Sequence, residues 1–339
     1  MTADRILERV MLAFEGARVP RWVERRLAEA PAAGVTLFMA YNVLRPGQVR
    51  ELTEAFQRAG QAGAARRAGP LLVAADQEGG QLNALGAEAT QFAGNMALGA
   101  VGDEALTRRV GAAIGREARA MGVNVVYAPV LDLATEPNNT ALGIRSFGDD
   151  PTEVARLGAA MVRGLQSAGV AAAVKHFPGL GAVDQDTHFE LGVVRGSRDD
   201  LDANELAPYR AAFVAGARMA MSAHVAVPGL TGDATLPATL SRTVMHGTLR
   251  DELGFRGVMI SDALDMHALA QGAAQAVEVI AAIRAGIDLL LTTADRPALR
   301  RIEQTLRAAV ARRLFESGEL EASSGRLAEL RSWLATAGP

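Results

Sequence analysis

The chain has 339 residues, enough for about two average domains or for one α/β barrel with insertions. Its 35 basic and 38 acidic residues give a formal net charge of −3 with neither sign clustered, which excludes the basic face of a nucleic-acid-binding protein. Cysteine is absent, which excludes disulfides, thiolate metal sites and cysteine nucleophiles. With no membrane-length apolar run and no signal-peptide h-region, we expect a cytoplasmic, monomeric protein without membrane partners.

Short apolar segments alternate with longer amphipathic segments along the chain. The short ones are not polar at alternate positions and are mostly rich in Val, Ile or Leu, which is typical of strands buried on both faces of a parallel sheet. They cover 35–39, 71–76, 123–133, 171–177, 219–225, 257–264 and 287–293. Between them, 103–122 and 151–169 have apolar residues at helical spacing, with Asp103 and the Pro151–Thr152 pair as predicted helix starts.

This alternation is compatible with a closed barrel or with an open doubly wound sheet. No G-x-G-x-x-G motif follows the first predicted strands and no P-loop is present, so a nucleotide-binding open sheet lacks its usual support. We therefore predict a TIM-type (β/α)8 barrel of seven or eight strands, with its active site at the C-terminal ends of the strands. It is expected to form one domain over residues 1–339, with 321–334 as the last helix closing the barrel.

Polar residues stand at or near the ends of five predicted strands. They are Asp76, Asp132, Lys175, His176, His224 and Asp262. In a parallel barrel all these ends share one face, which carries the active site. We therefore expect the side chains to converge on one mouth, although strand ends that simply run into polar loops would give a similar pattern.

The segment 175–188 carries a candidate general acid/base. Two glycines and a proline predict an irregular loop there rather than an immediate helix. Asp186 and His188 are two residues apart, so on an extended stretch both side chains project to one side. The carboxylate would then hold one imidazole nitrogen and leave the other facing the pocket, as in an acid/base with a fixed tautomer. A surface pair without function is the alternative.

Two further segments carry carboxylates at strand ends. Asp262 ends an apolar strand, where an unpaired carboxylate costs several kcal/mol, so it is a candidate nucleophile, metal ligand or structural ion-pair partner. Asp76 follows another buried strand, and Gly79–Gly80 allows the backbone to approach a ligand closely. Glu78, between them, is interpreted as a residue that braces the loop.

Several ordered motifs resemble glycoside hydrolase family 3, and in particular its single-domain, NagZ-like β-N-acetylglucosaminidase (β-hexosaminidase) branch. They extend over nearly the whole chain. GVTLFMAYN (34–42) resembles the first barrel strand of that family and DQEGG (76–80) follows its second. The others are NNTALGIRSFGDDP (138–151), KHFPG with D-x-D-T-H (175–188), SAHVAVPGL (222–230) and SDALDM (261–266).

The resemblance implies a retaining mechanism. Asp262 matches the nucleophile that forms a covalent glycosyl-enzyme, and His188, paired with Asp186, matches the acid/base. The residues implied to bind or line the sugar subsite are Asp76, Arg145, Lys175, His176 and His224. No metal or other cofactor is implied. Histidine metal ligands are the alternative, but the H-x-H strand motif of metal-dependent barrel hydrolases is missing.

The chain departs from the family pattern at a few positions. Leu180 replaces the second histidine of KHFPGHG, and Ala263 replaces the second aspartate of SDDL. Gln81 and Ala84 replace two arginines that follow DQEGG, and the second of these arginines normally helps to grip the sugar. These departures bear on the substrate more than on the reaction, because the predicted nucleophile and dyad are intact.

The predicted function is an exo-β-N-acetylglucosaminidase that acts on cell-wall fragments such as muropeptides, or on short glycans. Only 4% of the residues are aromatic, which argues against a long cleft with stacking platforms, and Phe147, Phe177 and Tyr127 are expected in the core. Three alternatives stay open: a phosphorylase, a β-glucosidase and a sugar-binding barrel without turnover. The phosphorylase is considered because a histidine acid/base does not repel phosphate as a second carboxylate would.

Overall fold

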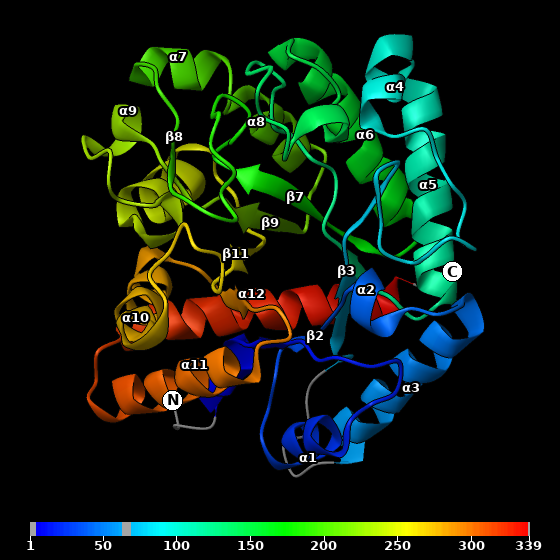
Figure 1. Cartoon of the computed structure of the whole chain (residues 1–339), viewed down its shortest axis with the longest axis vertical. Coiled ribbons are helices and arrows are strands. Elements are labelled where there is room, and N and C mark those ends of the chain that lie inside the picture. The colour runs from blue at the N-terminus through cyan, green and yellow to red at the C-terminus, as the bar shows by residue number, and fades with distance from the viewer. Residues whose placement is uncertain (1–4, 63–68, 338–339) are drawn as a thin grey trace.

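The computed structural model describes residues 5–62 and 69–337, which form a parallel barrel surrounded by helices (Figure 1). Within these residues, eight strands make one parallel sheet: β1 (Met11–Leu12), β2 (Gly34–Leu37), β3 (Leu72–Ala75), β6 (Val125–Val126), β7 (Ala171–Phe177), β9 (Met219–Ser222), β11 (Val258–Ala263) and β12 (Leu289–Leu291). A parallel bridge between Val10 and Leu290 brings the first strand to the last. The predicted barrel is thereby confirmed.

The structure corrects the predicted strands at two places. The first strand is β1, which we did not predict, so the segment 34–42 supplies the second strand of the barrel, Gly34–Leu37, rather than the first, and its last four residues are helical. Two residues are too few to show any periodicity in the sequence. The predicted strand 123–133 is a continuous strand only over Val125–Val126, and it pairs again with β7 at an isolated bridge between Val130 and Lys175. Pro129, which lies between the two, has no N–H for the ladder.

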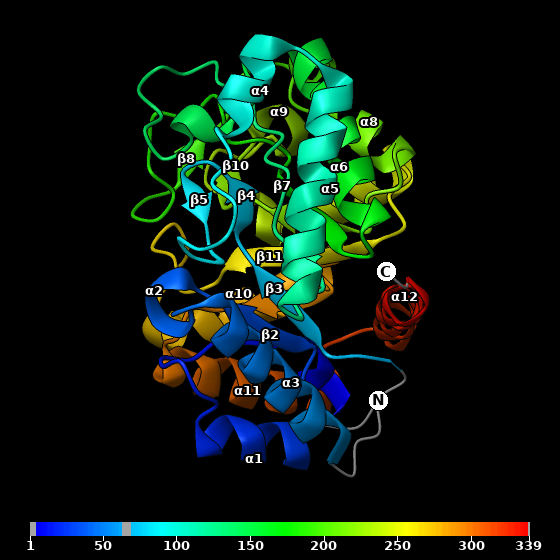
Figure 2. The same cartoon turned by 90° about the vertical axis from the view of Figure 1, so that its right-hand side faces the viewer.

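Helices surround the barrel along its outside and at its two ends (Figure 1, Figure 2). They are α1 (Arg21–Glu29), α2 (Met39–Asn42), α3 (Pro46–Ala62), α4 (Asn95–Val101), α5 (Glu104–Ala120), α6 (Pro151–Ser167), α7 (Arg198–Ala203), α8 (Ala207–Val214), α9 (Pro228–Thr231), α10 (Gln275–Ala285), α11 (Arg296–Ala311) and α12 (Ser317–Thr336). Asp103 caps α5 and α6 begins at Pro151, both as predicted, and the preceding Asp150 caps α6. Among the described residues, no helix is long and apolar enough to span a membrane.

Helix α12 closes the amino-terminal end of the barrel, as the sequence predicts for 321–334. Its leucines join the inward-facing strand residues in one cluster, which includes Leu327, Leu330, Leu334, Leu72, Val125, Met219 and Val258. Arg326 of α12 binds the buried Asp288 at 2.6 Å, and Arg250 binds the same carboxylate at 2.9 Å. Figure 2 shows α12 at one end of the barrel and α2 at the other. The opposite end, where the parallel strands finish, is left for the site.

Short elements and loops decorate that second end. A hairpin of β4 (Gln77–Gly79) and β5 (Leu82–Asn83) follows β3, and β8 (Gly192–Val193) pairs in parallel with β10 (Val225–Ala226). The remaining short helices of the described chain are η1 (Arg5–Arg9), η2 (Gly143–Arg145), η3 (Ala238–Leu240), η4 (Thr243–Glu252, a π-helix) and η5 (Gly272–Ala274). Of these, η1 lies beside α12 at the first end, where Arg9 binds the Leu320 carbonyl at 2.7 Å. The hairpin and η2 contribute side chains to the site.

Candidate active site

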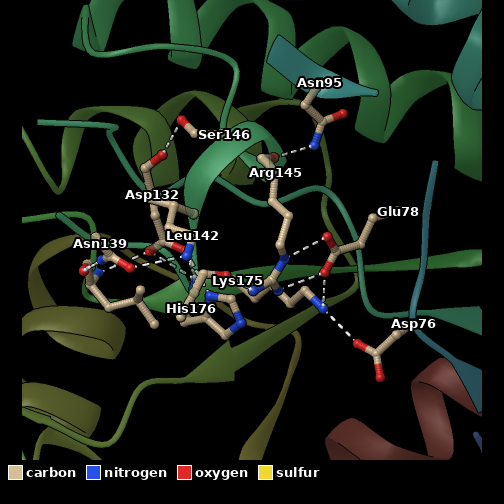
Figure 3. A network of polar contacts seen from close by, with 12 residues as sticks. Asp76, Glu78, Asn95, Asp132, Asn139, Leu142, Arg145, Ser146, Lys175 and His176 are labelled. Carbon is tan, nitrogen blue, oxygen red and sulfur yellow. Dashed lines mark hydrogen bonds and ion pairs between the residues drawn. The ribbon is translucent and has the colours of Figure 1, made fainter. Parts of the chain in front are cut away.

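A buried lysine near the end of β7 joins two carboxylates from the segment that follows β3 (Figure 3). The Nζ atom of Lys175 lies 2.6 Å from Asp76 Oδ1 and 2.6 Å from Glu78 Oε1. Burial alone lowers the pKa of Lys175, but the two carboxylates outweigh both burial and the repulsion from Arg145, so its pKa lies above the ordinary value. Lys175 is therefore a fixed cation with one ammonium hydrogen left for a ligand.

Glu78 holds Arg145 as well as Lys175. The guanidinium of Arg145 donates from Nε to Glu78 Oε2 at 2.9 Å and from Nη2 to Oε1 at 2.8 Å, the bidentate geometry that makes such pairs strong. Burial raises the pKa of the Glu78 carboxyl, yet the two cations lower it to about 2. We interpreted Glu78 as a brace for its own loop, but the structure shows it as the centre of an ion-pair network.

His176 is anchored by the carboxylate of Asp132. Its Nδ1 lies 2.6 Å from Asp132 Oδ2, and both carboxylate oxygens also accept from the backbone N–H of His176 at 3.2 Å. The same carboxylate accepts from the backbone N–H of Leu180 at 2.9 Å. With Nδ1 bound to a carboxylate, the ring is held in one orientation and its Nε2 is left for the site.

The loop after β7 is irregular, as predicted, and it packs closely against the backbone at Leu133. A Cβ atom on Gly181 would lie 1.7 Å from the carbonyl oxygen of Leu133, so only glycine fits at that close approach. Leu180, which replaces a family histidine, packs its side chain in the core, and its carbonyl accepts from Asn139 at 3.0 Å. At this position the chain substitutes an apolar contact for an imidazole.

Asp262 lies near the end of β11, and one of its two carboxylate oxygens accepts no hydrogen bond from the described residues. Its Oδ1 accepts from the backbone N–H of Ala263 at 2.7 Å, and no ion pair to Asp262 occurs within 5–62 and 69–337. Burial raises its pKa, but His176, His224, the Ala263 N–H and Lys175 together bring it below the ordinary value. The carboxylate is thus ionised and has no bound cation, which is the state that a nucleophile needs.

Both ring nitrogens of His224 are bound within the protein. Nδ1 lies 2.8 Å from Thr239 Oγ1, and Nε2 lies 3.1 Å from the carbonyl oxygen of Ala263, the residue after Asp262. Burial lowers the pKa of His224 more than the nearby Asp262 raises it, so its pKa lies below the ordinary value. With Nε2–H donating to the carbonyl, His224 fixes the backbone beside Asp262.

Asp186 and His188 form a pair, but on a turn rather than on the extended stretch we expected. Asp186 Oδ1 lies 2.6 Å from His188 Nδ1 and accepts from the His188 backbone N–H at 3.0 Å. The His188 side chain is 60% exposed, and its Nε2 has no partner among the described residues. Burial raises the pKa of Asp186, but the hydrogen bonds from His188 outweigh it and lower the pKa. The local spacing alone was sufficient to predict this pair.

Most predicted site residues therefore lie in one cluster at the strand ends. The clustered side chains are Asp76, Arg145, Lys175, His176, His224 and Asp262. No hydrogen bond or ion pair within the described residues joins these side chains to the Asp186–His188 pair, which lies on the loop after β7. It is tied to the segment following β11 by a bond from the His267 N–H to the His188 carbonyl at 3.0 Å.

Glu78 and Asp132 are the residues whose function the sequence did not indicate. Asp132 was among the polar strand-end residues, but nothing in the sequence pairs it with His176, 44 residues away. Glu78 and Arg145 are 67 residues apart, and their pairing depends on the path of the loop that ends in η2. Phe147, Phe177 and Tyr127 are buried, which confirms that they belong to the core.

Comparisons with known proteins agree on one family. Residues 7–330 match the model described as the glycosyl hydrolase family 3 N terminal domain. A β-hexosaminidase from Nitrosomonas eutropha is 34% identical over 292 residues, which is 84% of this chain and 80% of that protein. A β-hexosaminidase A from Pseudoalteromonas piscicida is 35% identical over 322 residues, covering 89% of this chain.

A similar solved structure is that of a glycoside hydrolase family 3 β-N-acetylglucosaminidase from a Paenibacillus species. It superposes with a TM-score of 0.95 at 37% identity and covers 100% of this chain, but only 64% of the Paenibacillus chain is matched. The match to the Pseudoalteromonas protein likewise spans 53% of its length. The chain thus corresponds to about half or two thirds of these longer relatives.

Proposed function

Because the chain belongs to glycosyl hydrolase family 3, we propose that it is a retaining exo-β-N-acetylglucosaminidase that removes a terminal β-linked N-acetylglucosamine from short glycans or cell-wall fragments. The relatives that support this substrate are named β-hexosaminidase or β-N-acetylglucosaminidase. We take residues 1–339 as a single catalytic domain that acts as a monomer and needs no cofactor.

The observation that carries the proposal is the state of Asp262. A carboxylate that attacks an anomeric carbon must be ionised and must not be neutralised by a bound cation. Asp262 meets both conditions, because imidazoles and a lysine lower its pKa from a distance while its only hydrogen bond in the described chain comes from Ala263. In the first step it forms the ester bond to the sugar as the bond to the leaving oxygen breaks.

His188 supplies the proton for that leaving oxygen. Its Nδ1–H is held by Asp186, so the imidazolium form carries a second proton on Nε2, which moves to the departing group and leaves a neutral ring. The bare Nε2 then accepts a proton from the attacking water. Lys175 and Asp76 bind sugar hydroxyl groups as donor and acceptor, and His176 presents its Nε2 to the same sugar. Arg145 acts mainly through Glu78, since three of its N–H groups already bind Glu78 and the Ala141 carbonyl.

The test is release of 4-nitrophenol from its β-N-acetylglucosaminide by the wild type and by Asp262→Ala. Release by the wild type and its loss in the variant support the proposal. Strong acceleration by phosphate would change the assignment to a phosphorylase, and release only from the β-glucoside would change it to a β-glucosidase. A sugar that binds without any release would make the chain a binding protein.

A further inference from the structure

One phenylalanine of the chain is displayed to solvent beside the proposed acid/base. Phe189 is 73% exposed, whereas the other nine phenylalanines are buried or half-buried. Single exposed apolar side chains are common on protein surfaces, so exposure by itself indicates nothing. The position of this ring is what distinguishes it.

The turn that carries the dyad also fixes Phe189. The backbone N–H groups of Phe189 and Glu190 both donate to the carbonyl of Asp186, at 2.9 and 3.2 Å. The same residue holds His188 through its carboxylate. The centroids of the His188 and Phe189 rings are 6.5 Å apart, with a tilt of 57° between the rings. The backbone of this turn therefore carries the phenyl ring beside the imidazole.

Chemistry places the leaving group next to this ring. An acid/base must reach the glycosidic oxygen, so the group on the far side of that oxygen lies beside His188 and not over Asp262. The turn is also joined to the segment after β11 by the bond between His267 and His188. An aromatic ring there presents an apolar face to whatever unit is being released.

The acidic residues of the same loop favour some leaving groups over others. Residues 178–194 contain Asp184, Asp186 and Glu190 and no lysine or arginine. Asp184 and Glu190 are exposed and form no ion pair in the described part of the chain. Their charges act within a Debye length of about 8–10 Å, which disfavours an anionic group on the phenyl ring.

We propose that Phe189, flanked by Asp184 and Glu190, forms the leaving-group subsite and selects a neutral pyranose ring over an anionic one. This deepens the proposed function and rests on it, because His188 defines which side is the leaving side. The C–H face of the released sugar packs on the phenyl ring, so the preferred substrate is a disaccharide of neutral N-acetylhexosamines. A muramic-acid unit, which carries a carboxylate, is disfavoured.

Calorimetric titration with ligands that are not cleaved tests the proposed leaving-group subsite. The probes are the S-linked β-1,4 disaccharide of N-acetylglucosamine, which is not cleaved, and methyl 1-thio-β-N-acetylglucosaminide, which lacks the second ring. Phe189→Ala should weaken disaccharide binding about fivefold, since roughly half of a phenyl side chain is covered, and should leave the methyl glycoside unchanged. Phe189→Trp should retain the affinity, and Val214→Ala, which trims another exposed side chain, should change neither titration.

The proposal would be overturned if Phe189→Ala weakened the binding of both ligands equally or changed the binding of neither. It would also be overturned if the wild type bound the disaccharide no more tightly than the methyl glycoside. An S-linked disaccharide whose second ring carries a lactyl carboxylate should bind the wild type more weakly than the neutral one. Glu190→Gln should reduce that difference about twofold at low salt, and tighter binding of the acidic probe would contradict the charge argument. Failure of the proposed function shows separately, as no release of nitrophenol by a protein that still binds these thioglycosides.

Discussion

Replacing Glu78 with glutamine removes the charge at the centre of the ion-pair network while keeping its shape. The pKa of Glu78 falls from 4.5 to about 2 in the folded protein, which corresponds to about 3 kcal/mol of folding stability at neutral pH. Removal of one partner of a buried ion pair costs about 3–5 kcal/mol, because the remaining charge is left uncompensated. We therefore expect Glu78→Gln to lower the free energy of unfolding by about 3 kcal/mol at pH 7.

The lowered pKa of Glu78 also determines how the stability difference between wild type and variant depends on pH. A carboxyl with a depressed folded-state pKa contributes fully above its unfolded pKa of 4.5, and the contribution is lost as the pH falls toward 2. In urea unfolding, the difference between wild type and variant should therefore shrink to about 2 kcal/mol at pH 3.5. Glu54→Gln, which breaks an exposed helical pair with Arg50, is the control and should cost under about 0.5 kcal/mol. A cost below about 1 kcal/mol for Glu78→Gln, or one independent of pH, would refute the reasoning.

Three further substitutions test other contacts. Asp132→Asn replaces one acceptor oxygen of the carboxylate with a donor, so His176 loses the partner that orients its ring. We expect kcat/KM to fall about 10- to 100-fold, and unchanged kinetics would contradict the orienting role of Asp132. Asp288→Asn should lower the free energy of unfolding by about 3 kcal/mol, measured in urea, because two arginines lose their counter-charge; a neutral result would mean that the pairs contribute little. Gly181→Ala should cost more than about 4 kcal/mol or prevent folding, since its Cβ would collide with the Leu133 carbonyl, and a normal thermal midpoint would show that the loop relaxes.

The sequence was sufficient to predict the convergence of the site. Parallel strands of a barrel end on one face, so polar residues such as Lys175 and Asp262 at strand ends had to meet there. The Asp186–His188 pair was predictable for a different reason, because two residues on one short segment stay close in any local conformation. The first prediction depended on the shared end of parallel strands, and the second depended on a short sequence separation.

The contacts that the sequence did not predict join distant and irregular segments. Arg145 reaches Glu78 from a loop with no repeating pattern, so its partner depends on how that loop folds back over β4. The first barrel strand, Met11–Leu12, was missed because two residues carry no periodicity. His224 was expected to line the pocket, yet hydrogen bonds to Thr239 and to the Ala263 carbonyl occupy both ring nitrogens.

The most direct test of the account is whether the sugar becomes covalently attached to Asp262. The protein is incubated with a slow fluorinated N-acetylglucosaminyl fluoride, digested, and mapped by mass spectrometry. We predict one added sugar on the peptide that contains Asp262, and none when Asp262→Asn is treated in the same way. A label on another residue, or no label while the wild type turns the reagent over, would contradict the proposed nucleophile.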